Sequence, residues 1–192
     1  MVDTHVVGVC GSLRDGSYTR VAVQRALDAA ADLGATTDLV DLRDLDVPVY
    51  DPVRDEPGDV ADLTRRIREA DAVVLGTPMY HGSYSSPLKT ALDYCGFDEF
   101  EHTTVGLLAV AGGSFPVTAL EHLRSVCRAL DAWVLPYQAA VPNSRSAVVD
   151  GDIRDERLAE RVDTLGRRVV QYADIKPDPA TFESGQNVGA GD

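Results

Sequence analysis

Lysine is scarce in this sequence: only Lys89 and Lys176 stand among its 18 basic residues, and the other 16 are arginines. Acidic residues number 31, which leaves a net charge of −13. A chain without a basic stripe cannot neutralise a row of phosphates, so a nucleic-acid partner is excluded. An acidic, lysine-poor surface keeps halophilic proteins soluble in strong salt. We therefore expect a halophilic source, with an ordinary acidic cytoplasmic protein as the alternative.

Long apolar runs and metal-binding patterns are also missing. No stretch approaches the roughly 18 apolar residues of a membrane span, and no basic segment followed by an apolar one opens the chain. Cys10, Cys95 and Cys127 fall in separate apolar segments without metal-ligand spacing, and His5 and His102 do not cluster with other ligands. We expect a soluble cytoplasmic protein with reduced cysteines, no metal site and no membrane contact.

The opening stretch of the chain is the one around which the rest is organised. Residues 5–10 form a β-branched apolar run typical of a buried parallel strand, and residues 19–33 have apolar side chains at helical spacing. Between them lies a polar turn with Ser12, Arg14 and Ser17. A strand–turn–helix unit directs free backbone N–H groups at an anion, and hydroxyls and a guanidinium add donors. The pattern predicts a phosphate-binding loop; the alternative is a plain turn in which Ser17 only caps the helix.

Three other phosphate-binding patterns do not fit this turn. Its glycines do not give the G-x-G-x-x-G of dinucleotide-binding proteins, and no Gly-Lys-Ser/Thr follows as in a nucleotide P-loop. A small phosphatase with a cysteine nucleophile carries Cys-x5-Arg, but here the sixth residue after Cys10 is Gly16, and Arg14 comes two residues too early. We therefore expect Cys10 to be a small buried hydrophobic residue.

Apolar strands alternate with amphipathic helices along the rest of the chain. Further strands are predicted at 35–42, 72–77, 105–111 and 133–141, and further helices at 59–70, 86–95, 117–130 and 154–173. Residues 43–58 are predicted as an irregular loop and residues 144–152 as a polar linker. Five such strands predict an α/β fold, a flavodoxin-like doubly wound parallel sheet of strand order 2-1-3-4-5. Residues 1–175 would form one domain and residues 176–192 a flexible C-terminal tail.

Polar Gly/Ser loops follow the first, third and fourth predicted strands, at 12–19, 78–84 and 112–115. In a sheet of this order they meet in one crevice, at the carboxyl ends of the strands. The second loop holds Met79, Tyr80 and Gly82. An aromatic ring and a thioether beside glycine suit a platform for a flat ring, and the alternative is a surface turn whose tyrosines pack on the next helix.

Several side chains near this loop have more than one interpretation. His81 is a candidate proton donor, because the pKa of histidine lies near neutrality, or else a plain polar contact. Lys89, in the following helix, either pairs with a carboxylate or contacts the ligand. We expect His122 and Arg124, on the helix at 117–130, to serve the structure or a subunit contact.

Three segments resemble one known family. GSLRDGSYTR at 11–20 resembles the phosphate-binding signature of the NADPH-dependent FMN reductases. GTPMYHGSYSSPLKTALDYCG at 76–96 resembles that family's second motif, especially in its azobenzene-reductase and sulfonate-linked FMN-reductase branches, and AGGSFPVTALEHLRSVCRALDAWVLP at 111–136 also resembles these branches. The likeness covers most of residues 5–140. It implies that the flavodoxin-like domain at 1–175 binds FMN noncovalently.

The resemblance also implies which residues hold the cofactor. The FMN phosphate would contact Ser12, Arg14, Ser17, Tyr18 and Thr19; the isoalloxazine would lie along Pro78, Met79, Tyr80, His81, Gly82 and Ser83; and Gly112, Gly113 and Ser114 would close its polar edge. Many relatives have Asn in place of Thr19, and Glu-Tyr-Asn at positions 79–81. We expect a weaker phosphate contact from Thr19, and the changes at 79 and 81 leave the electron acceptor open.

By the same resemblance, the protein would be an NAD(P)H-dependent flavin reductase. NADPH, or NADH, would deliver hydride to FMN, and the electrons would pass to a small-molecule acceptor of the flavin, quinone or azo type. No side chain need act as a catalytic acid or base, because the flavin carries the chemistry. The family implies a homodimer or homotetramer. One alternative is a flavodoxin-like FMN electron carrier without NAD(P)H turnover, and a remote third is a phosphate-ester hydrolase.

Overall fold

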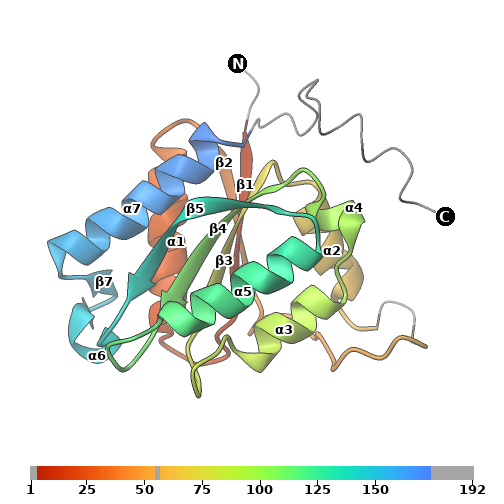
Figure 1. The fold of residues 1–192 in the computed structure, drawn as a ribbon, viewed down its shortest axis with the longest axis horizontal. Helices are drawn as coiled ribbons and strands as arrows, with labels where there is room; N and C mark the ends of the chain where they lie inside the picture. The colour runs from red at the N-terminus through yellow and green to blue at the C-terminus, as the bar shows by residue number, and fades with distance from the viewer. Residues whose placement is uncertain (1–3, 55–56, 174–192) are drawn as a thin grey trace.

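The computed structural model describes residues 4–54 and 57–173. At its centre lies a parallel sheet of five strands in the order β2-β1-β3-β4-β5, as predicted (Figure 1). The strands are β1 (His5–Cys10), β2 (Thr36–Asp41), β3 (Ala72–Pro78), β4 (Thr104–Val110) and β5 (Trp133–Val141). From β1 the chain first adds β2 on one side and then adds β3, β4 and β5 on the other side. At such a switch point the loops that follow β1 and β3 lead to opposite faces of the sheet and leave a crevice between them.

The central strands form because they are apolar on both faces. Every residue of β3 and β4 is buried, as are five of the six in β1. Gly76 of β3 shows how closely helix α1 (Tyr18–Ala31) packs on the sheet, because a Cβ there would lie 2.1 Å from Val23 Cγ2. Burial on both faces is the reason for the near-continuous apolar runs from which these strands were predicted.

Helices cover both faces of the sheet (Figure 1). One face packs against α1 and α7 (Glu156–Gln171), and the other against α2 (Val60–Arg68), α3 (Ser86–Asp93), α4 (Phe97–Phe100) and α5 (Val117–Ala129). The long helices begin and end within two residues of their predicted bounds. Among the described helices, none combines the length and the apolar character that crossing a membrane requires.

The polar linker predicted at 144–152 is wrong. The chain there forms a short helix, α6 (Ser144–Ala147), and an antiparallel hairpin of β6 (Val148–Val149) and β7 (Asp152–Ile153). Asp150 and Gly151 make the turn, with φ of 52° and 79°, the left-handed values of a two-residue primed turn. Such short elements bury too few apolar residues to produce a periodicity, although Asp-Gly is itself a hairpin signal.

Two further segments complete the comparison with the predicted elements. Helix α4 was not predicted; Glu99 stabilises its start by accepting a hydrogen bond from Gly96 N at 2.7 Å and by pairing with Arg68. The irregular loop predicted at 43–58 contains no helix or strand in its described part. The tail predicted at 176–192 lies outside the described residues.

The backbones of α7 and α1 touch at Gly166, where a Cβ would lie 2.0 Å from Ala26 O. We predict that Gly166→Ala lowers the free energy of unfolding by about 2 kcal/mol, because the clash outweighs the roughly 1 kcal/mol by which Ala favours a helix over Gly. Urea denaturation followed by circular dichroism measures this difference. The matched control is Gly112→Ala, whose added Cβ has no described atom within 4 Å. Equal stability of the two variants would contradict the close helix contact.

Candidate functional site

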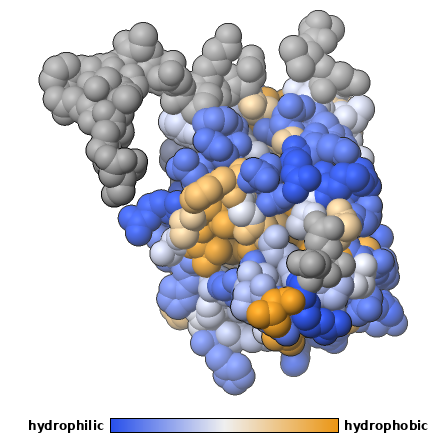
Figure 2. All heavy atoms as spheres, turned by 90° about the vertical axis from the view of Figure 1, so that its right-hand side faces the viewer, coloured by the Kyte–Doolittle hydropathy of each residue, from blue (hydrophilic) through white to orange (hydrophobic). Residues whose placement is uncertain are grey.

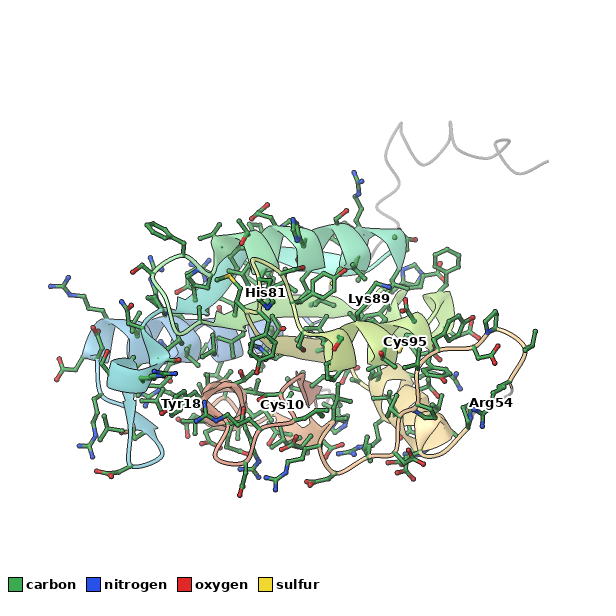
Figure 3. All side chains as sticks on the ribbon, turned by 90° about the horizontal axis from the view of Figure 1, so that it is seen from below. Cys10, Tyr18, Arg54, His81, Lys89 and Cys95 are labelled. Atoms are coloured by element: carbon green, nitrogen blue, oxygen red, sulfur yellow. The ribbon has the colours of Figure 1, made fainter. Side chains whose placement is uncertain are left out.

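The three predicted loops meet at the carboxyl end of the sheet. Figure 3 looks at this end and shows Tyr18 and Cys10 on one side of it and His81 on the other. Between the loops lies a cavity of about 130 Å³. Nine of the fourteen predicted site residues line it, namely Ser12, Arg14, Ser17, Tyr18, Thr19, Pro78, Met79, Tyr80 and Gly112, together with Val110, Ser144 and Arg145. The other five, His81, Gly82, Ser83, Gly113 and Ser114, lie in the same loops but outside this lining.

The loop after β1 offers hydrogen-bond donors to the cavity. Ser17 caps α1, because its Oγ accepts from Arg20 N at 3.2 Å, and the buried Ser12 accepts from Arg14 N at 3.4 Å. Within the described chain, the N–H groups of Tyr18 and Thr19 in the first helical turn have no acceptor. Ser17 is therefore a cap, as one interpretation proposed, and the free amides beside it form the kind of helix start that binds anions.

Cys10 lies directly before this loop and is fully buried. Burial raises the pKa of its thiol to about 11, and the nearby Asp41 carboxylate adds to the rise, while a hydrogen bond from the Ser12 backbone opposes it. At neutral pH the sulfur is therefore a protonated thiol and a poor nucleophile. Cys10 is the small buried residue that the sequence predicted, and the phosphatase interpretation has no thiolate to support it.

The loop after β3 is a tight, hydrogen-bonded turn. Tyr80 N donates to Ser83 O at 3.0 Å, and Ser83 N donates back to Tyr80 O at 3.1 Å. His81 and Gly82, between them, have φ of 49° and 83°, so both adopt the left-handed conformation of a primed turn. Met79 N donates to Val110 O at 2.8 Å, which ties the start of this turn to the end of β4.

Helix α5 holds the same turn from the other side. The Ser83 hydroxyl and His122 Nδ1 are 3.0 Å apart, and Thr118 Oγ1 lies 3.7 Å from the Met79 sulfur. We expected His122 to serve the structure or a subunit contact, and Thr118 was not singled out. The spacing of four between them, which places both on one face of a helix, is the only sequence signal that pairs them.

Two other side chains have the structural roles that the sequence offered as options. Lys89 pairs with the carboxylate of Asp93 one helical turn away. Arg124 donates to Leu135 O at 3.0 Å and to Gln138 Oε1 at 2.8 Å, so it joins α5 to β5. Neither lines the cavity between the three loops.

The loop after β4 is open where the predicted glycines stand. Gly112 and Gly113 have φ values that other residues adopt, and a Cβ on either would meet no described atom within 4 Å. Their small size therefore has no explanation within the described chain and leaves room for a ligand to approach the backbone. Asn143 N donates to Gly113 O at 3.0 Å and Ser144 N to Ala111 O at 2.9 Å, which brings the unpredicted helix α6 to the cavity.

Charge separates this cavity from a larger neighbour of about 530 Å³ on the outer side of the same loop. Arg14 lines both cavities. The larger one also holds aspartates, and two of them are paired with its other arginines: Arg20 lies 3.1 Å from Asp41, and Arg43 lies 2.7 Å from Asp15 and lowers the pKa of that carboxyl. The smaller cavity is lined by Arg14 and Arg145 and by no described carboxylate. In a protein of net charge −13 this is an uncompensated positive site, suited to an anion. No group of three or more His, Cys, Asp or Glu residues suited to hold a metal ion occurs in the described part of the chain.

Comparison with known proteins shows to which family this chain is related. Residues 4–146 match the NADPH-dependent FMN reductase family. The chain belongs to this family. It is therefore an oxidoreductase, with FMN and NADPH as its cofactors. The free amides, the uncompensated guanidiniums and the open glycine backbone described above fit a phosphorylated flavin.

Two relatives that match this chain are named FMN-dependent NADPH-azoreductases. The FMN-dependent NADPH-azoreductase of Staphylococcus haemolyticus is 30% identical over 188 residues, covering 88% of this chain and 95% of that one. The enzyme of the same name from Staphylococcus aureus is 40% identical over 140 residues, covering 71% and 74%.

Solved structures share the fold at low identity. An apo NADH:FMN oxidoreductase, EMOB, has a TM-score of 0.72 at 20% identity over 93% of both chains. FerB, a flavoenzyme NAD(P)H:(acceptor) oxidoreductase from Paracoccus denitrificans, has a TM-score of 0.70 at 23% identity, covering 90% of this chain and 97% of that one. They establish the flavodoxin-like fold.

Proposed function

We propose that this reductase uses NADPH to reduce bound FMN and passes the electrons to a flat aromatic acceptor, such as a flavin, a quinone or an azo compound. The observation that carries the proposal is the small cavity between three loops, lined by two guanidiniums and by no described carboxylate. When bound, FMN supplies the redox chemistry, because its ring accepts hydride and releases electrons. The residues of the chain bind it, orient it and leave its ring accessible.

The phosphate would be held by Ser12, Arg14, Ser17, Tyr18 and Thr19. The amides of Tyr18 and Thr19 and the guanidinium of Arg14 have no acceptor in the described chain, so they can donate to phosphate oxygens. The cavity holds about 130 Å³, well below the roughly 300–1,000 Å³ of pockets that enclose a whole ligand. This volume encloses only part of FMN, and because Pro78, Met79, Tyr80 and Gly112 also line it, the ring would extend from it along the loops after β3 and β4.

The ring would lie along Pro78, Met79, Tyr80, His81, Gly82 and Ser83, with Gly112, Gly113 and Ser114 closing its polar edge. Paired backbone hydrogen bonds fix the turn at Tyr80 and Ser83, and His122 and Thr118 brace it from α5. Ser114 Oγ lies 3.5 Å from Asn143 Oδ1, so the third loop is tied to the segment beyond β5. A platform that is rigid before binding loses little conformational entropy when a ligand arrives.

The exposed residues where the cavity opens to solvent, here called the mouth of the site, favour a flat apolar acceptor. Tyr80 is 54% exposed and Phe115 80%, on the two loops proposed to flank the ring, and Val117, at the start of α5, is 51% exposed. Exposed aromatic residues stack favourably on planar ligands. None of the described lining residues is Asp, Glu, His, Lys or Cys, so the cavity offers no such side chain for acid–base catalysis. The azo class is further supported by the relatives, which are named azoreductases.

We predict that the purified protein loaded with FMN is yellow, and that its visible absorbance disappears when NADPH is added without oxygen. Addition of an azo dye or a quinone should then restore it, because the electrons leave for the acceptor. Anaerobic absorbance spectroscopy measures both steps, and NADPH with free FMN is the control. A flavin that stays oxidised with NADPH, but is reduced by dithionite, would refute the reductase and favour the electron carrier.

We predict that Arg14→Ala weakens FMN binding by at least about tenfold, because a charge-assisted hydrogen bond contributes about 1.5–3 kcal/mol. Riboflavin, which lacks the phosphate, should bind both proteins equally. Titration of flavin fluorescence at fixed molar salt measures the two affinities. Arg128→Ala, an exposed arginine on α5 outside the cavity lining, is the control for loss of charge. An unchanged FMN affinity would remove Arg14 from the phosphate site.

Two further inferences concern the cellular location and source of the enzyme and its domain organisation. We infer a cytoplasmic protein from a halophilic source, supported by the net charge of −13 and the presence of only two lysines. We also infer that residues 1–175 form one FMN-binding domain. One apolar cluster on the α1 and α7 face runs from Val6 to Val169, so the first and last described elements share a core.

We further propose a homodimer or homotetramer. Figure 2 shows a hydrophobic area on an otherwise mostly hydrophilic face. Between α3 and α5 lies a groove of about 400 Å³. Its lining combines the apolar Leu92, Cys95, Val126, Ala129 and Leu130 with Ser125 and the paired Lys89 and Asp93. A second copy that packs on this groove would bury the apolar side chains in a contact that is self-complementary by symmetry.

We predict that Ala129→Arg, which puts a charge into the groove, lowers the mass in solution to that of a monomer. Light scattering in molar salt measures the mass, and Ala61→Arg on the exposed side of α2 should leave it unchanged. A wild-type protein that is monomeric would refute the assembly. An assembly that both variants preserve would exclude this groove as its interface.

A further inference from the structure

Arg145 lies at the cavity, yet nothing in the sequence singled it out. It stands on α6, in the segment predicted as a linker, and it lines the cavity together with Arg14, Ser12 and Ser17. Its guanidinium makes no hydrogen bond or ion pair with any described residue. We propose that Arg145 is a second guanidinium of the phosphate site, and that it closes on the FMN phosphate from the side opposite the loop after β1. This inference rests on the proposed function of the site.

The pairing of charges around α6 explains why Arg145 is left without a partner. Asp150 and Asp152, the acidic residues of the hairpin, are already paired with Arg154 at 3.2 Å and with Arg25 at 3.1 Å. Arg145 therefore faces a cavity without any described carboxylate, in a chain with 31 acidic residues. Two such arginines at one cavity match the charge of a phosphate monoester, which is about −1.5 to −2 at pH 7.

The backbone that carries Arg145 is firmly held. Asn143 adopts a left-handed conformation with φ of 49°, and its carbonyl accepts from Ala147 N at 3.1 Å and from Ser146 Oγ at 2.9 Å. Ser144 N bonds to Ala111 O, and Val148 and Ile153 of the hairpin are buried in the core beside α1 and α7. The position of Arg145 relative to the phosphate loop is therefore set before a ligand binds, although its side chain remains exposed.

The same contacts favour the FMN phosphate over the anionic groups of NADPH. Arg145 shares its cavity with Ser12 of the loop after β1 and with Ser17 and Thr19 at the start of α1, and about 130 Å³ does not accommodate two ligands. A guanidinium presents a flat fork of donors that can engage two phosphate oxygens at once, which lysine cannot do. Because lysine cannot form this bidentate contact, Arg145→Lys should restore only part of the affinity for the phosphate.

The test measures FMN and riboflavin dissociation constants for Arg145→Gln and Arg145→Lys at fixed molar salt. We expect Arg145→Gln to weaken FMN by at least about tenfold and to leave riboflavin unchanged, with Arg145→Lys between wild type and Gln. The matched control is Arg157→Gln, which removes an exposed arginine of α7 whose guanidinium has no described partner.

Three other outcomes would overturn the inference that Arg145 binds the FMN phosphate. Equal weakening of FMN and riboflavin would mean that Arg145 shapes the site rather than contacts the phosphate. Unchanged FMN affinity with a raised KM for NADPH, but not for NADH, would assign Arg145 to the nicotinamide cofactor instead. Unchanged values throughout would make it a solvated surface residue. In the last two cases, wild-type protein that binds FMN and is bleached by NADPH would still uphold the proposed function, so the two failures are distinguishable.

Discussion

Two buried hydrogen bonds at Gly11 join the loops on which the site depends. Gly11 N donates to Gly76 O at 2.8 Å, and Gly11 O accepts from Ser85 Oγ at 2.6 Å. Ser85 N donates to Thr77 Oγ1 at 2.9 Å, which closes the network around the end of β3. A Cβ on Gly11 would lie 2.8 Å from Leu88 Cβ, so only glycine allows this approach. The loop after β1 and the start of α3 therefore cannot shift independently, and the loops that follow β1 and β3 keep a fixed separation.

Electrostatics explains how an acidic protein can hold an anionic cofactor. At long range a net charge of −13 repels FMN, but in molar salt the Debye length falls to about 3 Å and only direct contacts count. The cavity between the loops has guanidiniums without carboxylate partners, whereas Arg20 and Arg43 of the larger neighbouring cavity, which Arg14 also lines, are paired with Asp41 and Asp15. The distribution of ion pairs therefore favours the smaller cavity for an anion.

Most of the fold could be predicted from the sequence, and the predicted loops do meet at one cavity. Buried strands and amphipathic helices are local patterns, so the five-stranded order and the three loops at its edge could be predicted. The contacts of Thr118 and His122 with the turn after β3, and the position of Arg145 at the cavity, could not be predicted, because each depends on segments distant in the sequence. Arg145 also lies in a segment whose elements, α6 and its hairpin, are too short to produce a periodicity, so the sequence predicts only a polar linker there.

The two ends of the site differ in a way that suits alternate reactants. At the phosphate end, the donors are fixed by the helix cap at Ser17 and by the backbone bonds of α6. At the proposed ring end, Tyr80 and Phe115 are exposed, and His81 lies in the turn between Tyr80 and Ser83. This arrangement would concentrate binding energy on the part of FMN that does not react. A ring face left open can meet NADPH first and an acceptor afterwards, and the choice of acceptor then depends on what stacks at the mouth rather than on a catalytic side chain.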